Sequence, residues 1–494
     1  MLEREIKLVV TPSFRLPALG DRFEGVEAVP AQPQRLSATY FDTDDLRLAR
    51  WGASLRRRNE EGWTVKLPVG ADGQLLTRQE LTFPGPAGRP PEAAVNAVRA
   101  YIRTAPLRPQ ARLRTVRRRI ELRDPQGRVL AELVEDEVSV LDGRRIAMRF
   151  RELGVEATGD TPPRLLGEVA AWLREAGAGA AEATPKVARA LGPLATGPPD
   201  VVVPALPPGA TAGDVVRRAL AASVLRLIRH DPPMRLDRDP EDLHQARVAT
   251  RRLRSDLRTF GGLVQAEWAS GLRDELGWLA GVLGAVRDRD VMLERMVRRV
   301  DGLAEASRPR VAGILTTLQA ARGEARTELL ETLRGDRYLA LLDGLVEAAN
   351  APLLLPEAEL PAKDVLPGLV RQPLRALTRQ VKALADGGSD DELHQVRIQA
   401  KRARYAAEAV APVLGKRARV VARAAAGLQE TLGEHRDAVV AERWLRAWVQ
   451  RSRSLPVAFT TGELAGLERA AAAEARARWP GAWRAFTARR GGWP

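Results

Sequence analysis

The sequence predicts a multidomain α+β protein: an antiparallel eight-stranded β-barrel at the N-terminal end, then an all-α region of two pseudo-symmetric four-helix bundles. Three observations predict this fold. Between residues 1 and 160, apolar and polar residues alternate between closely spaced turn residues, as in β-strands. Beyond residue 210, Ala, Leu, Arg and Glu recur at helical spacing. In that second region one segment occurs twice, 150 residues apart, which indicates a duplicated bundle.

The first region contains eight segments that alternate as strands do. A helical segment at residues 92–104 interrupts them, and short helices near residues 163–176 and 184–191 end the region. Eight strands are enough to close a barrel with room for one slender ligand, so we place a barrel domain at residues 1–195. The expected strands are 2–10, 35–42, 53–59, 62–68, 75–83, 111–122, 128–140 and 145–157.

Prolines mark the domain boundaries. Six of them lie between residues 193 and 213, the composition of a semi-rigid linker, so we place a linker at residues 196–210 and a helical domain at 211–490. A second proline-rich stretch, from Pro352 to Pro367, separates the two copies of the repeated segment. The expected halves of the helical domain are therefore residues 211–350 and 368–490.

Composition narrows the classes of function. The net charge is +15, which indicates an acidic partner such as nucleic acid, polyphosphate or a membrane surface. Cysteine is absent, which excludes disulfides and thiolate metal sites and leaves oxygen or imidazole ligands for a metal. The sequence contains no apolar run of membrane-spanning length, and its first residues, MLEREIK, lack the apolar core typical of a signal peptide. We expect a soluble cytoplasmic protein without a membrane partner.

Charged residues occupy every second position of several expected strands. Glu3, Glu5 and Lys7 share one face of the first strand, and Ile6 and Leu8 share the other. A solvated face explains any single strand, but in a closed barrel covered by helices the charged face points inward. Inward carboxylates and cations are costly to bury unless a ligand needs both, and a triphosphate with its divalent cation is such a ligand. The pattern recurs in Arg56 with Arg58, Lys66, Arg78 with Glu80, Arg117 with Arg119, Glu132 with Asp136, and Glu152 with Glu156.

Six motifs in this region resemble the CYTH domain of the triphosphate tunnel metalloenzymes. They are EREIK at the N-terminal end, YFDT, LRRR, WTVKLP, AELVEDEV and TPKVARAL. The resemblance implies a tunnel that hydrolyses inorganic triphosphate or a related compound with Mg²⁺ or Mn²⁺. It implies metal ligands at Glu3, Glu5, Glu152 and Glu156. The implied triphosphate-binding residues are Lys7, Arg56, Arg58, Lys66, Arg78, Arg117, Arg119 and Lys186, and candidates to orient the attacking water or the basic residues are Glu80, Glu132 and Asp136.

One position departs from the family pattern. The last strand of the family commonly carries ExExE, but this chain reads ELGVE, with Gly154 in place of the middle carboxylate. A missing ligand weakens the second metal of a two-metal displacement. We therefore expect slow or metal-selective hydrolysis, and a barrel that binds without hydrolysing stays open as an alternative.

The repeated segment carries a basic stripe. Its copies are LHQARVATRRLR at Leu243 to Arg254 and LHQVRIQAKRAR at Leu393 to Arg404. On a helix, positions 0, +3, +7 and +10 of the stripe lie on one face, with no carboxylate between them, and such a row fits a chain of phosphates. The candidate polyphosphate-binding residues are His244, Arg247, Arg251, Arg254, His394, Arg397, Lys401 and Arg404.

These segments, each followed by LGxxRD, resemble the CHAD domain, the conserved-histidine α-helical domain. The resemblance implies two four-helix bundles that bind inorganic polyphosphate. We expect Asp288 and Asp437 of the LGxxRD motifs to position arginines. We also expect bound phosphate to favour protonated His244 and His394, so that affinity rises as pH falls through about 6.5.

Together the two halves predict a triphosphatase whose helical domain binds polyphosphate and places the protein on polyphosphate granules. A non-catalytic polyphosphate scaffold is an alternative, and adenylate cyclase or thiamine triphosphatase activity in the same tunnel is another. Nucleic-acid binding is disfavoured because aromatic residues make up only 4% of the chain, which leaves few platforms on which bases stack. The sequence does not predict the oligomeric state.

Overall fold

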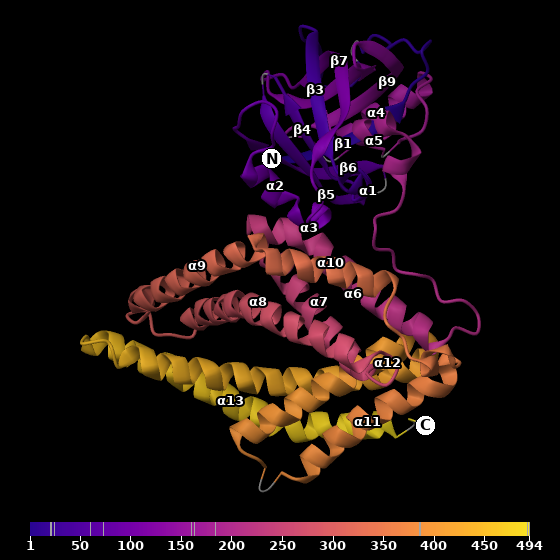
Figure 1. Ribbon diagram of the computed structural model, residues 1–494. Coiled ribbons are helices and arrows are strands. Elements are labelled where there is room, and N and C mark those ends of the chain that lie inside the picture. Colours follow the sequence, from indigo (N-terminus) through magenta and orange to yellow (C-terminus); the bar gives the residue numbers. More distant parts are fainter. Residues whose placement is uncertain are drawn as a thin grey trace. The chain divides into compact units, whose positions relative to one another are not determined.

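The structure is a computed structural model that describes residues 1–494 except 20, 21, 24, 60, 73, 160, 163, 183, 385, 386, 492 and 494. The chain forms two compact units, Met1–Asp200 and Val201–Pro494. The first contains the strands and the second only helices and connecting segments (Figure 1). Pro163, where one short helix was expected to begin, lies outside the described residues.

Eight antiparallel strands of the first unit close into a barrel, as predicted. Their order is β7-β3-β4-β5-β6-β1-β9-β8, and the barrel closes because β8 pairs with β7 as well as with β9. An additional short strand that the sequence analysis did not identify, β2 (Glu27–Pro30), pairs with β7. The barrel strands are β1 (Leu2–Val9), β3 (Gln34–Asp42), β4 (Ser54–Arg58), β5 (Gly62–Asp72), β6 (Leu75–Phe83), β7 (Arg108–Arg123), β8 (Val129–Asp142) and β9 (Arg145–Ala157).

A helix on the outside of the barrel explains why the charged faces point inward. Helix α4 (Leu165–Glu175) and the strands β1, β8 and β9 share one apolar core, to which β1 contributes Ile6 and Leu8. Successive side chains of a strand point to opposite sides. Burial of Ile6 and Leu8 against α4 therefore directs Glu5 and Lys7 into the barrel.

The remaining helices of this unit are short. The expected helix at 92–104 is two helices, α2 (Glu92–Ala97) and α3 (Arg99–Ile102), because the backbone leaves the helical conformation at Val98. Helix α1 (Arg47–Arg50), which was not expected, follows the YFDT motif. The Asp42 carboxylate of that motif accepts hydrogen bonds from the backbone N–H groups of Thr43, Leu48 and Ala49. Helix α5 (Lys186–Leu191) and a 3₁₀ turn (Pro193–Thr196) complete the unit.

The second unit is helical, in agreement with the sequence prediction, and its helices follow the two sequence repeats. Helices α6, α7 and α8 of the first repeat correspond to α11 and the two halves of α12, which is broken at Gly415 by a positive φ of 64°. Helices α9 and α10 together correspond to α13. The bounds are α6 (Ala212–Leu236), α7 (Pro240–Thr259), α8 (Ala266–Val300), α9 (Ala312–Arg334), α10 (Asp336–Asn350), α11 (Ala362–Lys382), α12 (Asp390–Val449) and α13 (Leu455–Arg490).

The connection between the repeats is shorter than expected. Helix α11 begins at Ala362, six residues before the expected start of the second half at residue 368. Pro367 lies inside this helix, in its second turn, where its missing N–H removes one i→i−4 hydrogen bond. In the described part of the chain, no helix is both long enough and apolar enough to span a membrane.

Candidate functional site

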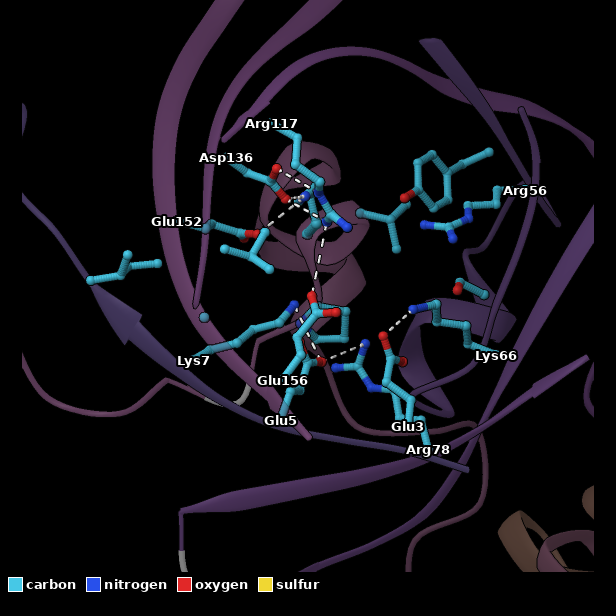
Figure 2. Close-up of a pocket in the computed structure, with 18 residues that line it drawn as sticks. Glu3, Glu5, Lys7, Arg56, Lys66, Arg78, Arg117, Asp136, Glu152 and Glu156 are labelled. Carbon is cyan, nitrogen blue, oxygen red and sulfur yellow. Dashed lines mark hydrogen bonds and ion pairs between the residues drawn. The ribbon is translucent and has the colours of Figure 1, made fainter. Parts of the chain in front are cut away.

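The inward faces of the strands build a charged cavity inside the barrel (Figure 2). Its open volume is about 60 Å³, because long acidic and basic side chains fill most of the interior. Residues 3, 5 and 7 of β1 and residues 152, 154 and 156 of β9 face it, as expected from the two-residue period of a strand. The charged residues that line the cavity are Glu3, Glu5, Lys7, Arg56, Lys66, Arg78, Arg117, Asp136, Glu152, Glu156 and Lys186.

Three of the four expected metal ligands lie together. Glu3, Glu5 and Glu156 bring carboxylate oxygens within 4.8 Å of one another. Glu5 and Glu156 are direct cross-strand partners, an arrangement in which like charges repel. Burial and the nearby Glu5 and Glu3 raise the pKa of Glu156, although Arg117 opposes this effect.

This group fits a divalent cation. Glu3 Oε2 is buried and has no hydrogen-bond partner among the described residues. A hard cation such as Mg²⁺ or Mn²⁺ prefers carboxylate oxygens, and it would relieve the repulsion between Glu5 and Glu156. The donor set is therefore suited to an ion that holds phosphate oxygens.

Glu152, the fourth expected metal ligand, lies apart from these three. It is the cross-strand partner of Asp136, and its carboxylate is 3.7 Å from Lys186 Nζ. Lys186 also forms an ion pair with Asp136. The structure thus places Glu152 in a lysine-bridged pair of carboxylates and not in the Glu3, Glu5 and Glu156 group.

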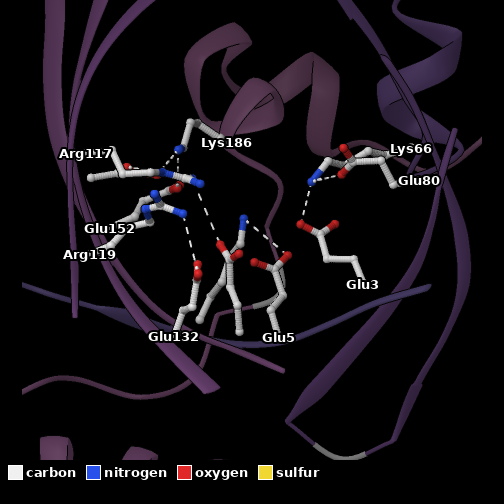
Figure 3. A network of polar contacts seen from close by, with 12 residues as sticks. Glu3, Glu5, Lys66, Glu80, Arg117, Arg119, Glu132, Glu152 and Lys186 are labelled. Atoms are coloured by element: carbon white, nitrogen blue, oxygen red, sulfur yellow. Dashed lines mark hydrogen bonds and ion pairs between the residues drawn. The ribbon is translucent and has the colours of Figure 1, made fainter. Parts of the chain in front are cut away.

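Every cation that lines the cavity has a carboxylate partner, and Figure 3 shows some of these pairs, among them Lys66 with Glu3 and Glu80. Lys66 Nζ lies 2.5 Å from Glu3 Oε1 and 2.9 Å from Glu80. Arg117 donates two hydrogen bonds to Asp136, at 2.9 and 2.8 Å. Burial alone would raise the pKa of Asp136, but Arg117 and Lys186 lower it well below its usual range. The other cation contacts are Lys7 with Glu5 at 3.6 Å, Arg78 with Glu5 at 3.7 Å and Arg56 with Glu80 at 3.9 Å.

The helical unit contains a second charged site, a groove of about 410 Å³. Residues of both basic stripes line it, because helices α7 and α12, which carry the two stripes, pack against each other. The expected residues His244, Arg247, Arg251, Arg397 and Lys401 line this groove. Further lining residues are Arg287, Asp288, Val291, Met292, Arg295, Arg436, Asp437 and Val440.

Burial and repulsion between cations together determine the electrostatics of the groove. Burial, together with the positive charges of Arg251, Arg397 and Arg247, lowers the pKa of Lys401 to about 7. Burial and neighbouring arginines also lower the pKa of His244. Such a site is favourable for a polyanion, because bound negative charge removes the repulsion.

Two family models match the chain, one to each unit. The CYTH domain model matches residues 1–182 and the CHAD domain model matches residues 218–446. Two proteins of Mycobacterium tuberculosis, the uncharacterized proteins MT2285 (strain CDC 1551) and Rv2226 (strain H37Rv), are each 34% identical to this chain over 476 residues. The alignment covers 90% of this chain and 88% of each relative. The chain belongs to the CYTH–CHAD family.

Two solved structures are similar to part of this chain. The CHAD domain of the plant Ricinus communis is 26% identical, with a TM-score of 0.49, and covers 58% of this chain and 96% of its own. PptA from Streptomyces chartreusis is 27% identical, with a TM-score of 0.47, and covers 56% of this chain and 99% of its own.

Four expected residues of the CYTH barrel lie beside the cavity and do not line it. Arg58 Nη1 is 2.7 Å from Glu61, and Arg119 is 3.4 Å from Glu132. Glu80 contacts Lys66 and Arg56, as described above. Glu80, Glu132 and Asp136 thus each hold a basic residue of the barrel.

Three expected residues of the CHAD stripes do not line the groove. Arg404 forms an ion pair with Glu408 at 2.7 Å, and Arg254 lies against Gly277. His394 is half-buried, and its Nδ1 atom has no hydrogen-bond partner among the described residues. Burial, Arg436 and Arg397 lower its pKa.

The sequence analysis missed several residues that line the two sites. Tyr40 of the YFDT motif and Ser54 line the barrel cavity. Burial alone would raise the pKa of Tyr40, but Arg56 and Lys186 lower it. In the CHAD groove, Arg287 and Arg436 are the arginines of the two LGxxRD motifs. The repetition of the LGxxRD motif was the sequence signal from which these two arginines could have been predicted.

The glycines of the LGxxRD motifs lie beside arginines of the stripes. A Cβ atom at Gly284 would lie 3.7 Å from the Arg247 guanidinium, and one at Gly433 would lie 3.4 Å from Arg397 Nε. Asp288 of the first motif, as expected, contacts Arg247 at 2.8 Å. The two motifs thus face equivalent arginines.

Proposed function

We propose that this protein is a divalent-metal-dependent hydrolase of inorganic triphosphate whose CHAD domain binds inorganic polyphosphate. The observation that carries the proposal is the pair of opposed carboxylates, Glu5 and Glu156, with Glu3 beside them, in a cavity otherwise lined by cations. Membership of the CYTH–CHAD family supports chemistry on a triphosphate in the barrel and polyphosphate as the ligand of the helices.

In this proposal Glu3, Glu5 and Glu156 hold Mg²⁺ or Mn²⁺. When bound, the ion would draw charge from the phosphate oxygens and lower the barrier to phosphoanhydride cleavage. The cavity lining holds six cations and five carboxylates, so its own charge is only slightly positive. A highly charged triphosphate therefore needs the cation as well as the lysines and arginines.

The basic residues position the substrate. Arg56, Arg78 and Arg117 offer planar guanidinium groups that match phosphate oxygens, and Lys7, Lys66 and Lys186 offer point charges. Developing charge on the transferred phosphoryl group is neutralised by these groups, which the carboxylates hold in place before the substrate arrives. Asp136 holds Arg117 and Lys186, and Glu80 holds Lys66. We assign to them, and to Glu132 beside Arg119, the positioning of the basic residues.

The groove of the CHAD domain binds the longer polymer. Arg247, Arg251, Arg397 and Lys401 come from both repeats and face one groove, so one chain of phosphates contacts both. In this proposal the CHAD domain retains the protein on polyphosphate granules in the cytoplasm and raises the local concentration of phosphate polymers near the barrel.

Release of phosphate from tripolyphosphate with Mg²⁺ or Mn²⁺ tests the hydrolase. We expect turnover that is lost in Glu3→Ala and in Glu5→Ala. Turnover of ATP and thiamine triphosphate, measured beside it with each metal, tests the cyclase and thiamine triphosphatase alternatives. Full polyphosphate binding with no hydrolysis of any of the three compounds would favour the non-catalytic scaffold, the alternative that Gly154 supports.

Competition tests the ligand of the CHAD groove. We expect DNA at equal phosphate concentration to leave labelled polyphosphate bound, because the described residues that line the groove include no Phe, Tyr or Trp on which bases stack. Displacement by DNA would contradict the polyphosphate assignment.

A further inference from the structure

Opposed carboxylates recur inside the barrel, and each pair needs a positive charge between its members. Glu5 is the cross-strand partner of Glu156, and Asp136 is the partner of Glu152. Like charges directly opposite each other destabilise a pair of strands. The way in which the protein neutralises each pair indicates how many metal ions the barrel accommodates.

The Asp136 and Glu152 pair already has a cation. The Lys186 ammonium contacts Asp136 and lies 3.7 Å from Glu152 (Figure 3). Arg117 adds two hydrogen bonds to Asp136 from the other side. Both carboxylates are buried, so a metal ion at this pair would have to displace the Lys186 ammonium.

The Glu5 and Glu156 pair has no such bridge. The cations nearest to it lie at 3.6 Å (Lys7 to Glu5), 3.7 Å (Arg78 to Glu5) and 4.0 Å (Arg117 to Glu156), and no one of them contacts both carboxylates. Glu3 adds a third carboxylate with an unpartnered, buried oxygen. This pair therefore has both the ligands and the space for an added cation.

Gly154 removes the ligand that would join the two pairs. It lies between Glu152 and Glu156 on β9, faces the cavity, and is the cross-strand partner of Lys7. A Cβ atom at this position would meet only the Ile6 carbonyl oxygen, at 3.9 Å. A carboxylate side chain would fit there, but this chain has none.

We propose that the barrel holds a single divalent cation, at Glu3, Glu5 and Glu156, and that the Lys186 ammonium takes the place of a second cation between Asp136 and Glu152. The inference rests on the proposed function and specifies its metal stoichiometry. An ammonium has three N–H donors, so Lys186 keeps one for a phosphate oxygen while it contacts both carboxylates. In a two-metal site a second metal ion supplies this positive charge; here the Lys186 ammonium supplies it.

Binding of Mn²⁺ to the full-length protein tests this proposal, by equilibrium dialysis and by electron paramagnetic resonance. The number of barrel sites is the number of Mn²⁺ ions bound per chain by the wild type minus the number bound by the double variant Glu5→Gln, Glu156→Gln. We expect one barrel site per chain, with the spectrum of an isolated ion. Two barrel ions per chain, a spin-coupled spectrum, or no barrel ion would each overturn the proposal.

Two variants sharpen the result. Lys186→Gln removes the ammonium, and Gly154→Glu adds a carboxylate; in each we expect a second barrel ion close enough to couple with the first. Lys363→Gln changes an exposed lysine of the CHAD domain and serves as the control, with one ion expected. A count that stays at one in both folded variants would overturn the role given to Lys186 and Gly154.

The test of the metal stoichiometry can fail or succeed independently of the test of the proposed function. One barrel ion without tripolyphosphate hydrolysis would contradict the hydrolase and leave the stoichiometry intact. Hydrolysis with two coupled ions would contradict the stoichiometry alone.

Discussion

The CYTH barrel and the CHAD groove are both rich in cations, but they differ in what neutralises them. Each lysine and arginine that lines the barrel cavity lies within 4.0 Å of a carboxylate. Among the described residues, no carboxylate lies that close to Arg251, Arg397 or Lys401 in the groove. The pKa values differ accordingly: Arg117 and Lys186 lower that of Asp136 despite its burial, whereas burial and repulsion lower that of Lys401 to about 7.

This difference indicates two kinds of anion site. The barrel is preorganised, with charges of both signs held in place, and in the proposed function its ligand binds together with a metal ion. The groove holds cations that repel one another, and bound polyphosphate would relieve that repulsion. We expect polyphosphate binding in the groove to be more sensitive to salt than triphosphate binding in the barrel.

The largest effect is expected at Glu156. Glu156→Gln removes one of the two opposed carboxylates while keeping the size of the side chain, so metal is held poorly and kcat/KM for tripolyphosphate falls by about 10²–10³-fold, the cost of removing one main electrostatic contact. Phosphate release measures this. Glu137→Gln is the matched control, because Glu137 is on the same barrel but is exposed and pairs with Arg118; equal losses in both variants would contradict the assignment.

A large effect on the other site is expected from Arg247→Ala combined with Arg397→Ala. Each arginine is expected to make charged hydrogen bonds worth about 1.5–3 kcal/mol, so the affinity for long polyphosphate falls by at least about 10²-fold. Calorimetry or filter binding measures it. Tripolyphosphate hydrolysis should stay within twofold, and the exposed Arg423→Ala should bind normally. Loss of hydrolysis along with binding would show that the two sites are not independent.

A smaller effect is expected from pH. Bound polyphosphate favours the protonated form of Lys401, whose pKa is lowered to about 7, so affinity rises as pH falls through 7. Linkage gives about a tenfold gain between pH 8 and pH 6. His244 and His394 contribute at lower pH than the expected 6.5, because burial and nearby arginines lower their pKa values.

Lys401→Arg separates these contributions. Arginine stays charged throughout this range, so the variant should lose the dependence between pH 8 and pH 6.5 and keep only the part due to the histidines. An unchanged pH profile in Lys401→Arg would contradict the role of Lys401.

The smallest effect is expected at Gly433. Gly433→Val places carbon atoms against Arg397, and about 1 kcal/mol of strain would weaken polyphosphate binding about fivefold. Gly427 lies six residues earlier on the same helix, with open space around it, so Gly427→Val is the control. Equal changes in both variants would indicate a general effect on the helix.

Sequence patterns predicted the strands and the inward charges well, because both follow from the two-residue period of a strand under an apolar helix. Glu3 and Glu5 could be placed from β1 alone. The contact partner of Glu152 could not be predicted, because that partner, Lys186, comes from a helix distant in the sequence. This contact depends on the pairing of β8 with β9 and on the position of α5. Neither can be predicted from the alternation of residues within one strand.

In the CHAD domain, helical periodicity predicted which residues form each stripe. It did not predict which of these side chains line the groove. Arg247 and Arg397 line the groove and lie beside Gly284 and Gly433 of neighbouring helical segments. Arg404 belongs to the same stripe but turns to Glu408, four residues further on. Which member of a stripe faces the groove depends on packing between helices.

The separation of the two sites can be measured most directly with a chelator. Tripolyphosphate hydrolysis and long-polyphosphate affinity are measured on the same preparation of wild-type protein, with Mn²⁺ and after addition of EDTA. The account predicts that EDTA lowers hydrolysis by at least about 10²-fold and changes the affinity by less than twofold. Hydrolysis that persists without metal, or polyphosphate binding that disappears with it, would contradict the account.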